Sequence, residues 1–440
     1  MSDAASSPSG APHVVVVGAG LSGMIAAYRL QQAGLRATVL ERAARPGGRF
    51  SVEVLEGLVY HPSYPVLPGP APTLIGVLRE LGCAERVTRH QLREFYLRTR
   101  RGLRRVRTRP NHWRGLRKTW RRNRLRRIHS DFDGLLRQGR PELATRLDDR
   151  SIVQFLRLYL GRRPAALNSA LFETAFGLEG AETSRLLLMR HLDGWCEFAP
   201  AELFGLGSFV RALPEQLSDL RTDSAVRSIQ ADGRGVVLAS GESLACDATV
   251  IATRADSALE LLPDPTPAEE LALKGVQYRK RLNVVAAVKQ EHAMRTILTS
   301  PSVESPLAGA TDVTPENSPA GNRLRLLMLI ARPEFARALW QDSDVNLCNT
   351  LLNRIASPRS PLRKSVQSLA VHRLEAESPS YDVGHFRAIA RLTKSVRSRF
   401  QHRRVLLAGD YLVSPDLEGC ALTATRAADA LTLALGKQQL

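Results

Sequence analysis

The segment from His13 to Glu41 constrains the fold of this chain more than any other. His13–Gly18 holds four consecutive valines before a glycine, which predicts a buried parallel strand. A helical pattern follows over Leu21–Ala33, and Ala37–Glu41 predicts a second strand. A strand, a helix and a strand within about thirty residues form the unit of a doubly wound parallel sheet, so we expect an α/β fold.

The turn between the first strand and the helix has the spacing Gly-x-Gly-x-x-Gly in Gly18, Ala19, Gly20, Leu21, Ser22 and Gly23. Gly18 permits a tight turn, Gly20 lets backbone amides approach a pyrophosphate, and Gly23 lets the helix pack close to the strand. The positive helix N-terminus then faces the phosphates. Glu41 is placed to accept hydrogen bonds from ribose hydroxyls, and we include the adjacent Arg42 in the site. This pattern predicts a dinucleotide site without distinguishing NAD from FAD.

Two further motifs resemble those of one family. Arg45-Pro46-Gly47-Gly48-Arg49 follows the second strand, and Leu407-Ala408-Gly409-Asp410 precedes Leu417-Glu418-Gly419 near the C-terminus. On these residues the chain resembles the flavin-containing amine oxidase superfamily, which includes protoporphyrinogen oxidases and phytoene-type desaturases. The resemblance implies FAD as the cofactor, with a cofactor site that also includes Gly48, Arg49, Val226, Gly409, Asp410, Leu417 and Glu418. It further implies that Asp410 accepts hydrogen bonds from ribityl or ribose hydroxyls.

The resemblance follows the whole chain in family order and implies a Rossmann-type FAD domain with an inserted α+β substrate domain. We expect a disordered tail over residues 1–12. The FAD-binding domain is expected to combine residues 13–85, 203–262 and 396–440. The substrate domain is expected to combine 86–202 and 263–395. We expect residues 265–395 to be mixed and rich in loops, with strands at Asn283–Lys289 and Leu324–Ile330.

Several residues depart from the amine oxidases of this superfamily. Asn283 stands where many of them have a lysine beneath the flavin, and Pro415-Asp416-Leu417 replaces an aromatic wall of their amine cage. His61 and Ser63 stand where the family commonly has an acid and a glycine. His61 is either a general base, with an ordinary pKa near neutrality, or a structural histidine. No other catalytic residue is assigned.

We therefore predict an FAD-dependent oxidoreductase that removes a hydride from a conjugated, apolar or polycyclic substrate and passes electrons to oxygen or a quinone. An amine oxidase and a non-catalytic FAD-binding protein of the same fold remain alternatives. The five scattered cysteines predict neither a disulfide framework nor a metal site. No signal peptide and no membrane-spanning run is visible, so we expect a cytoplasmic protein.

The net charge of +19 is concentrated in one basic segment, residues 93–127, which holds fifteen arginines and one lysine against one acid. Phe95–Leu97 and Leu103–Val106 predict a hairpin, and Trp113, Leu116 and Trp120 fall on one face of a basic amphipathic helix. Three interpretations are open: a solvated arginine-rich face, a peripheral surface for an anionic membrane or acidic partner, and nucleic-acid binding. Nucleic acid is the least favoured, because no nucleic-acid motif accompanies the charge.

Overall fold

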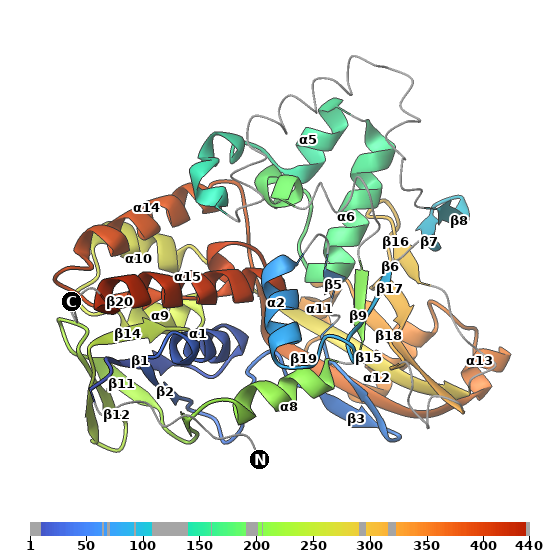
Figure 1. The fold of residues 1–440 in the computed structure, drawn as a ribbon. Coiled ribbons are helices and arrows are strands. Elements are labelled where there is room, and N and C mark those ends of the chain that lie inside the picture. The colour runs from blue at the N-terminus through green and yellow to red at the C-terminus, as the bar shows by residue number, and fades with distance from the viewer. Residues whose placement is uncertain are drawn as a thin grey trace.

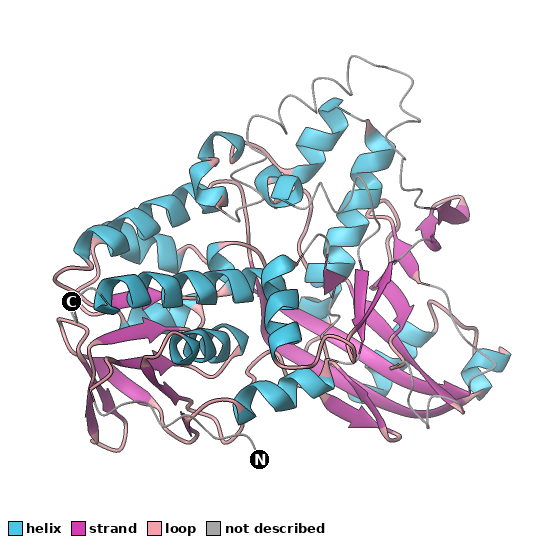
Figure 2. Cartoon of the chain, in the orientation of Figure 1, coloured by secondary structure: helices cyan, strands magenta, loops and turns pink. Residues whose placement is uncertain are grey.

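The computed structural model describes residues 10–63, 66–67, 71–91, 94–107, 140–159, 161–190, 201–204, 206–289, 296–315 and 323–436. A parallel sheet with its helices lies on the left of Figure 1, and a larger sheet lies on the right. Figure 2 shows the long strands gathered in the right half, with most of the long helices above and to the left of them.

The left-hand sheet has five parallel strands in the order β10-β2-β1-β14-β20. These strands come from three distant stretches of the chain: β1 (His13–Val17), β2 (Arg36–Leu40), β10 (Asp219–Arg221), β14 (Ala248–Ile251) and β20 (Val405–Leu407). Val16 at its centre pairs with Val39 on one side and Val250 on the other, and all three are buried. The valine run forms a central strand because both faces of a parallel sheet are covered by helices. The predicted α/β fold is confirmed.

Helices and a small antiparallel sheet surround this parallel sheet. Helix α1 (Leu21–Gln32) directly follows β1 and packs against α15 (Leu417–Gly436), so an early and a late segment of the chain lie side by side. The other surrounding helices are α2 (Pro72–Glu80), α8 (Gly207–Glu215), α9 (Ala255–Leu261), α10 (Pro267–Lys274) and α14 (His385–Arg399). The small sheet contains β11 (Val226–Ile229), β12 (Gly235–Leu238) and β13 (Ser243–Ala245).

The right-hand sheet has seven strands in the order β19-β15-β18-β17-β16-β7-β8, and its neighbours are antiparallel except for the parallel pair β16 and β7. Its strands are β7 (Glu94–Thr99), β8 (Gly102–Arg107), β15 (Tyr278–Lys289), β16 (Ile297–Thr299), β17 (Leu307–Asp312), β18 (Leu324–Ala331) and β19 (Val366–Pro379). The expectation that residues 265–395 are rich in loops is wrong. Strand β19 is 14 residues long, and the sequence conceals it because this edge strand is mostly half-buried and carries charged residues.

The remaining elements fill the space above and beside the large sheet. Helices α5 (Ile152–Tyr159) and α6 (Arg162–Phe176) share a core with Tyr381 and Phe386, which follow β19. The shorter elements are β3 (Glu53–Leu55), β4 (Leu58–Tyr60), β5 (Val66–Leu67), β6 (Thr88–Gln91), β9 (Ala201–Phe204), α11 (Pro333–Ala338), α12 (Asp344–Leu352), α13 (Pro361–Lys364) and the 3₁₀ turns η2 (Pro141–Leu143), η3 (Thr145–Leu147) and η6 (Asp410–Leu412).

The basic segment is described in part. Strands β7 and β8 form the predicted hairpin, and its exposed tip carries Arg100, Arg101, Leu103 and Arg104. The predicted basic helix around Trp113 lies outside the described residues, as does most of the predicted N-terminal tail. Among the helices that the structure describes, none is long and apolar enough to cross a membrane.

Candidate functional site

A cavity of about 670 Å³ opens where the parallel strands end. Gly18 follows β1, Glu41 follows β2, Ala252 follows β14 and Gly409 follows β20, and all four line the cavity. They meet because the carboxyl ends of parallel strands lie at one edge of a sheet, which is the usual ligand-binding edge of such folds. The cavity continues to β19 of the large sheet, so both halves of the molecule contribute to its wall.

The glycine turn has the close contacts that the motif requires. Gly18 has a φ of 99°, a conformation that favours glycine. A Cβ atom on Gly23 would lie 1.8 Å from the carbonyl oxygen of Gly18, so no other residue fits there. A Cβ on Gly20 would meet no atom within 4 Å, and Gly20 lines the cavity, so its backbone is open to a phosphate group. Gly23 acts through packing, because it is not part of the cavity wall.

Glu41 fixes the turn in addition to lining the cavity. Its Oε2 accepts a hydrogen bond of 2.8 Å from the amide of Ala19, and its Oε1 accepts one of 2.9 Å from the amide of Ala43. A carboxylate offers about four acceptor positions, so further positions remain for ribose hydroxyls. The neighbouring Arg42, and Val226 at the start of β11, line the same end of the cavity. This end is suited to the adenosine half of a dinucleotide.

Arg49 and Asp410 bring the two flavin-type motifs together in the middle of the cavity. The guanidinium donates from Nη1 to Asp410 Oδ2 at 2.8 Å and from Nη2 to Asp410 Oδ1 at 2.9 Å. Burial opposes the charge of Arg49, but the attraction and hydrogen bonds of Asp410 outweigh it and raise the pKa of Arg49. Gly48 and Gly409 line the cavity beside this ion pair.

The residues of the C-terminal motif have two different surroundings, since one lines the cavity and the next contacts a helix behind it. Leu417 lines the cavity, whereas the Glu418 carboxylate turns to α2 and accepts hydrogen bonds from the amides of Leu74 at 2.8 Å and Thr73 at 3.2 Å. The amide of Gly419 donates to Asp416 Oδ1 at 2.6 Å. The side chain of Glu418 therefore caps a helix N-terminus instead of facing the cavity.

His61, which follows β4, lines the cavity together with Phe50. This part of the cavity is called the inner end. The side chain of His61 is buried and stacks on Phe50 with ring centroids 5.0 Å apart. Burial lowers the pKa of His61 to about 4, although a hydrogen bond to the backbone of Ser51 acts in the opposite direction. Its Nε2 has no hydrogen-bond partner among the described residues. His61 is therefore an uncharged imidazole at pH 7.

Asn283 lies beneath the inner end in the fully buried centre of β15. Its Nδ2 donates to the carbonyl oxygen of Pro62 at 2.7 Å, and its Oδ1 accepts from Arg281 Nε at 3.4 Å. Arg281 also donates to the carbonyl oxygens of Thr174 and Ala175 at the end of α6. An amide that holds the backbone of the His61 segment thus occupies the position at which the family resemblance leads one to expect a lysine.

Most of the site residues predicted from the sequence line this one cavity. Those that line the cavity are Gly18, Gly20, Leu21, Ser22, Glu41, Arg42, Gly48, Arg49, His61, Val226, Gly409, Asp410 and Leu417. Ala19, Gly23 and Glu418 stand behind it. A cavity lined by the glycine turn, by the acid after β2, by the Arg49–Asp410 ion pair and by apolar and aromatic side chains such as Leu417 and Phe50 fits FAD.

Sequence reasoning missed the contribution of β19. Glu377 lines the inner end, and its carbonyl oxygen accepts a hydrogen bond of 2.8 Å from Arg49 Nη1. The hydroxyl of Tyr381, just beyond β19, donates to the carbonyl oxygen of Asp410. No motif marks these residues, because their role follows from how an edge strand crosses the cavity.

Comparisons with known proteins agree with this geometry. The model of the family described as flavin containing amine oxidoreductase matches residues 21–432. Cyclohexylamine oxidase from Brevibacterium oxydans has a similar structure, with a TM-score of 0.73 at 17% identity over 97% of this chain and 100% of that one.

Matches to curated sequences are short. Protoporphyrinogen oxidase 2 of Arabidopsis thaliana is 37% identical over 73 residues, which is 17% of this chain and 14% of that protein. The L-amino-acid oxidase of Daboia russelii is 62% identical over 37 residues, which is 8% of this chain and 7% of that protein. These stretches are much shorter than either relative, so they do not identify the substrate of this chain. The family match over nearly the full length does establish membership: the chain belongs to the flavin containing amine oxidoreductase family, and its cofactor is FAD.

Proposed function

We propose that the protein oxidises an uncharged conjugated, apolar or polycyclic substrate by removing a hydride, and that oxygen or a quinone then accepts the electrons. Bound FAD supplies the hydride-accepting chemistry. The chain supplies the cavity that holds the cofactor and the substrate.

The observation that carries this proposal is the environment of Asn283. A lysine there would place an ammonium beneath the flavin, whereas the Asn283 amide is uncharged, fully buried and bonded to Pro62. Nearby, His61 is uncharged and Arg49 is neutralised by Asp410. Ala175, Phe176, Pro415 and Leu417 add apolar surface to the lining. These uncharged neighbours favour an uncharged substrate over a protonated amine, because an ammonium ion loses its hydration on entry.

The residues of the site have separate tasks in this function. Glu41 and the glycine turn hold the adenosine and diphosphate groups, and Arg49 with Asp410 fixes the middle of the cofactor. The Asn283–Pro62 hydrogen bond keeps the segment that carries His61 against β15. Together they fix the substrate carbon and the flavin in one geometry, which is how a protein accelerates hydride transfer.

The test is an anaerobic reduction screen of the FAD-loaded protein. A polyene, a porphyrinogen and a set of primary and secondary amines are mixed with it, and the flavin absorbance at about 450 nm is followed. We expect bleaching by a polyene or porphyrinogen and none by the amines. Admission of air or a soluble quinone should then restore the absorbance. Dithionite reduction in a parallel sample shows that the bound flavin can be reduced.

Two other outcomes would each overturn the proposal. Bleaching by amines alone would indicate an amine oxidase. A flavin that dithionite reduces but none of the three compound classes bleaches would indicate a non-catalytic FAD-binding protein.

We further propose that the basic segment, residues 93–127, docks on an anionic membrane surface, from which an apolar substrate would be drawn. At the hairpin tip Leu103 is 54% exposed between Arg101 and Arg104, and an apolar side chain among cations is suited to such a surface.

Reversing the charge of Arg100, Arg101 and Arg104 should weaken sedimentation with phosphatidylserine vesicles. The matched reversal of Arg391, Lys394 and Arg397 on α14 should not. Equal effects of the two reversals, or no vesicle binding by the parent protein, would exclude this role.

A further inference from the structure

Glu377 is an acidic side chain that lines the inner end of the cavity and that the site described above does not use. It lies in β19, where its carbonyl oxygen is held by Arg49 Nη1 at 2.8 Å. Arg49 is in turn fixed by the ion pair with Asp410, so the backbone of Glu377 is anchored to the cofactor-binding part of the cavity. Its position is therefore tied to the two motifs that hold FAD.

The side chain of Glu377 has a specific partner in the segment that carries His61. Ser63 hydrogen-bonds the carboxyl group, and Ser63 also lines the cavity. A glycine at position 63, as the family resemblance would lead one to expect, has no hydroxyl for this contact. The chain thus has a neutral histidine at position 61 and a carboxyl group that enters the same region from β19.

The surroundings make Glu377 a stronger base than an ordinary glutamate. Burial raises the pKa of Glu377, while Arg281, Arg49 and Ser63 act to lower it and Asp410 acts to raise it. The net shift is upward. His61 moves in the opposite direction, since burial lowers its pKa to about 4. Of the two groups, Glu377 is therefore the better base, because its pKa is raised whereas that of His61 is lowered.

Introducing a double bond requires a base of this kind. A hydride leaves one carbon for the oxidised flavin, and a proton must leave the neighbouring carbon so that its electron pair can form the second bond. We propose that the Glu377 carboxylate accepts this proton, with Ser63 as the residue that positions it. The proton then leaves to solvent, and the reduced flavin returns its electrons to oxygen or a quinone. This inference rests on the proposed function, because it assigns the proton acceptor of that reaction.

A first experiment needs no substrate. The visible spectrum of the FAD-loaded protein is recorded from about pH 4 to pH 9, since a carboxyl group that ionises beside a flavin perturbs its absorbance. We expect one transition above the ordinary range of a glutamate. Glu377→Gln should abolish it, and Ser63→Ala should move it to higher pH, because the hydroxyl stabilises the carboxylate. Glu215→Gln, on the exposed end of α8, is the matched control and should leave the transition unchanged.

A second experiment uses whichever compound bleaches the flavin. The anaerobic reduction rate should rise with pH to a plateau as Glu377 ionises. Glu377→Gln should lower the plateau by about 10²–10⁴-fold and remove the dependence on pH. Ser63→Ala should retain a rate within about tenfold of the parent at high pH while shifting the profile upward. A merely structural role for Ser63 would not shift the profile.

The proposal is overturned if Glu377→Gln binds FAD normally and keeps both the spectral transition and a reduction rate within about threefold of the parent. If no compound bleaches the flavin, the proposed function fails, and the spectral titration still decides by itself whether Glu377 ionises beside the flavin. An absorbance ratio of flavin to protein equal to that of the parent shows that each variant is folded and loaded.

Discussion

Arg49 and Asp410 are separated by 361 positions in the chain and form a bidentate ion pair with nitrogen–oxygen distances of 2.8 and 2.9 Å. The pair joins the loop after β2 to the start of η6, which follows β20, so the first and last segments of the parallel-sheet half meet at the cavity. The side chain of Arg49 remains 34% accessible on the cavity side. An arginine in this position both fixes two loops and lines the cavity.

Arg49→Lys should therefore weaken FAD binding without unfolding the protein. Lysine keeps the charge but cannot form the planar double contact with Asp410. We expect the FAD dissociation constant to rise about 10–100-fold, which corresponds to one or two strong hydrogen bonds. Titration of the apoprotein with FAD, followed by quenching of flavin fluorescence, measures it. Arg29→Lys alters an ion pair with Glu80 on the other side of α1 and should leave affinity unchanged; equal losses in both variants would contradict a specific role for Arg49.

Gly23→Ala should prevent the glycine turn from closing. Its Cβ would overlap the Gly18 carbonyl oxygen, so α1 must shift away from β1 and the phosphate site opens. We expect little bound FAD after purification and a lower melting temperature. Gly76→Ala in α2 meets no atom within 4 Å and should instead stabilise the protein by about 0.5–1 kcal/mol. Normal FAD content in Gly23→Ala would show that the helix does not pack as closely as described.

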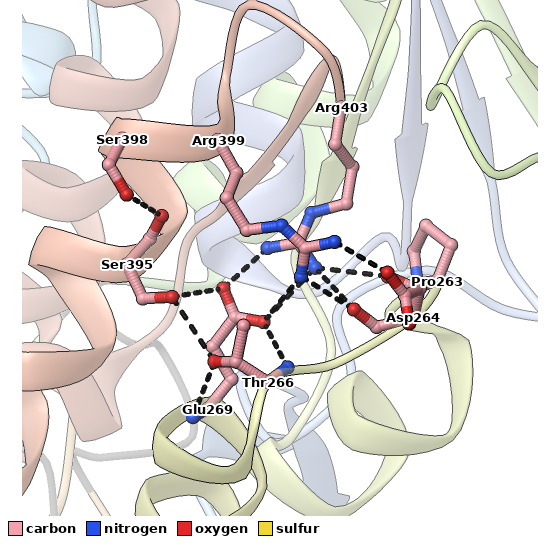
Figure 3. A network of polar contacts seen from close by, with 8 residues as sticks. All are labelled: Pro263, Asp264, Thr266, Glu269, Ser395, Ser398, Arg399 and Arg403. Atoms are coloured by element: carbon pink, nitrogen blue, oxygen red, sulfur yellow. Dashed lines mark hydrogen bonds and ion pairs between the residues drawn. The ribbon is translucent and has the colours of Figure 1, made fainter.

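The buried ion pair of Glu269 and Arg403 should be critical for stability (Figure 3). The Glu269 carboxylate accepts from Arg403 at 2.5 and 3.1 Å and from Ser395, and it also closes the capping box with Thr266 at the start of α10. Arg403→Met leaves a buried carboxylate without its main partner and should lower the free energy of unfolding by about 3–5 kcal/mol. Urea denaturation measures the loss.

A double variant separates the charge effect from packing. Adding Glu269→Leu to Arg403→Met removes the buried carboxylate that has lost its main partner and keeps only the 3.5 Å ion pair with Arg399, so part of the stability should return. A double variant that is less stable than Arg403→Met alone would show that Glu269 acts mainly through its cap on α10.

The contribution of His61 to stability should fall as the pH is lowered from about 6.5 to about 4. Burial lowers the pKa of His61 to about 4 in the folded state, whereas an unfolded histidine has a pKa of 6.5. Between these values the unfolded state binds a proton that the native state does not, so the free energy of unfolding decreases with decreasing pH. The shift corresponds to about 3 kcal/mol for His61.

Urea denaturation at several pH values across this range tests the His61 effect. His61→Asn should reduce the slope of stability against pH. His385 also has a pKa lowered to about 4 by burial and should contribute to the slope in the same direction. An identical slope in the parent and His61→Asn would contradict a buried, neutral His61.

Local sequence determined the dinucleotide turn. Four valines, the spacing of Gly18, Gly20 and Gly23, and Glu41 at the next strand end are short-range features whose geometry needs only a strand, a turn and a helix. The motifs around Arg49 and Asp410 likewise marked two further pieces of the cavity wall. Periodicity could not show that these pieces meet, because contacts across 361 positions depend on which strands join the sheet and in which order.

Only the tertiary structure decided what the inner end of the cavity contains. Strand β19 is a half-exposed edge strand with charged residues. Its residue pattern therefore predicts neither the length of the strand nor the position of Glu377 at the cavity. The burial of His61 and the rotation of Glu418 towards α2 also depend on neighbours distant in sequence. The sequence specified residue types and local turns, whereas pKa values and side-chain directions were decided by the packing of distant elements, since burial and charge act through space.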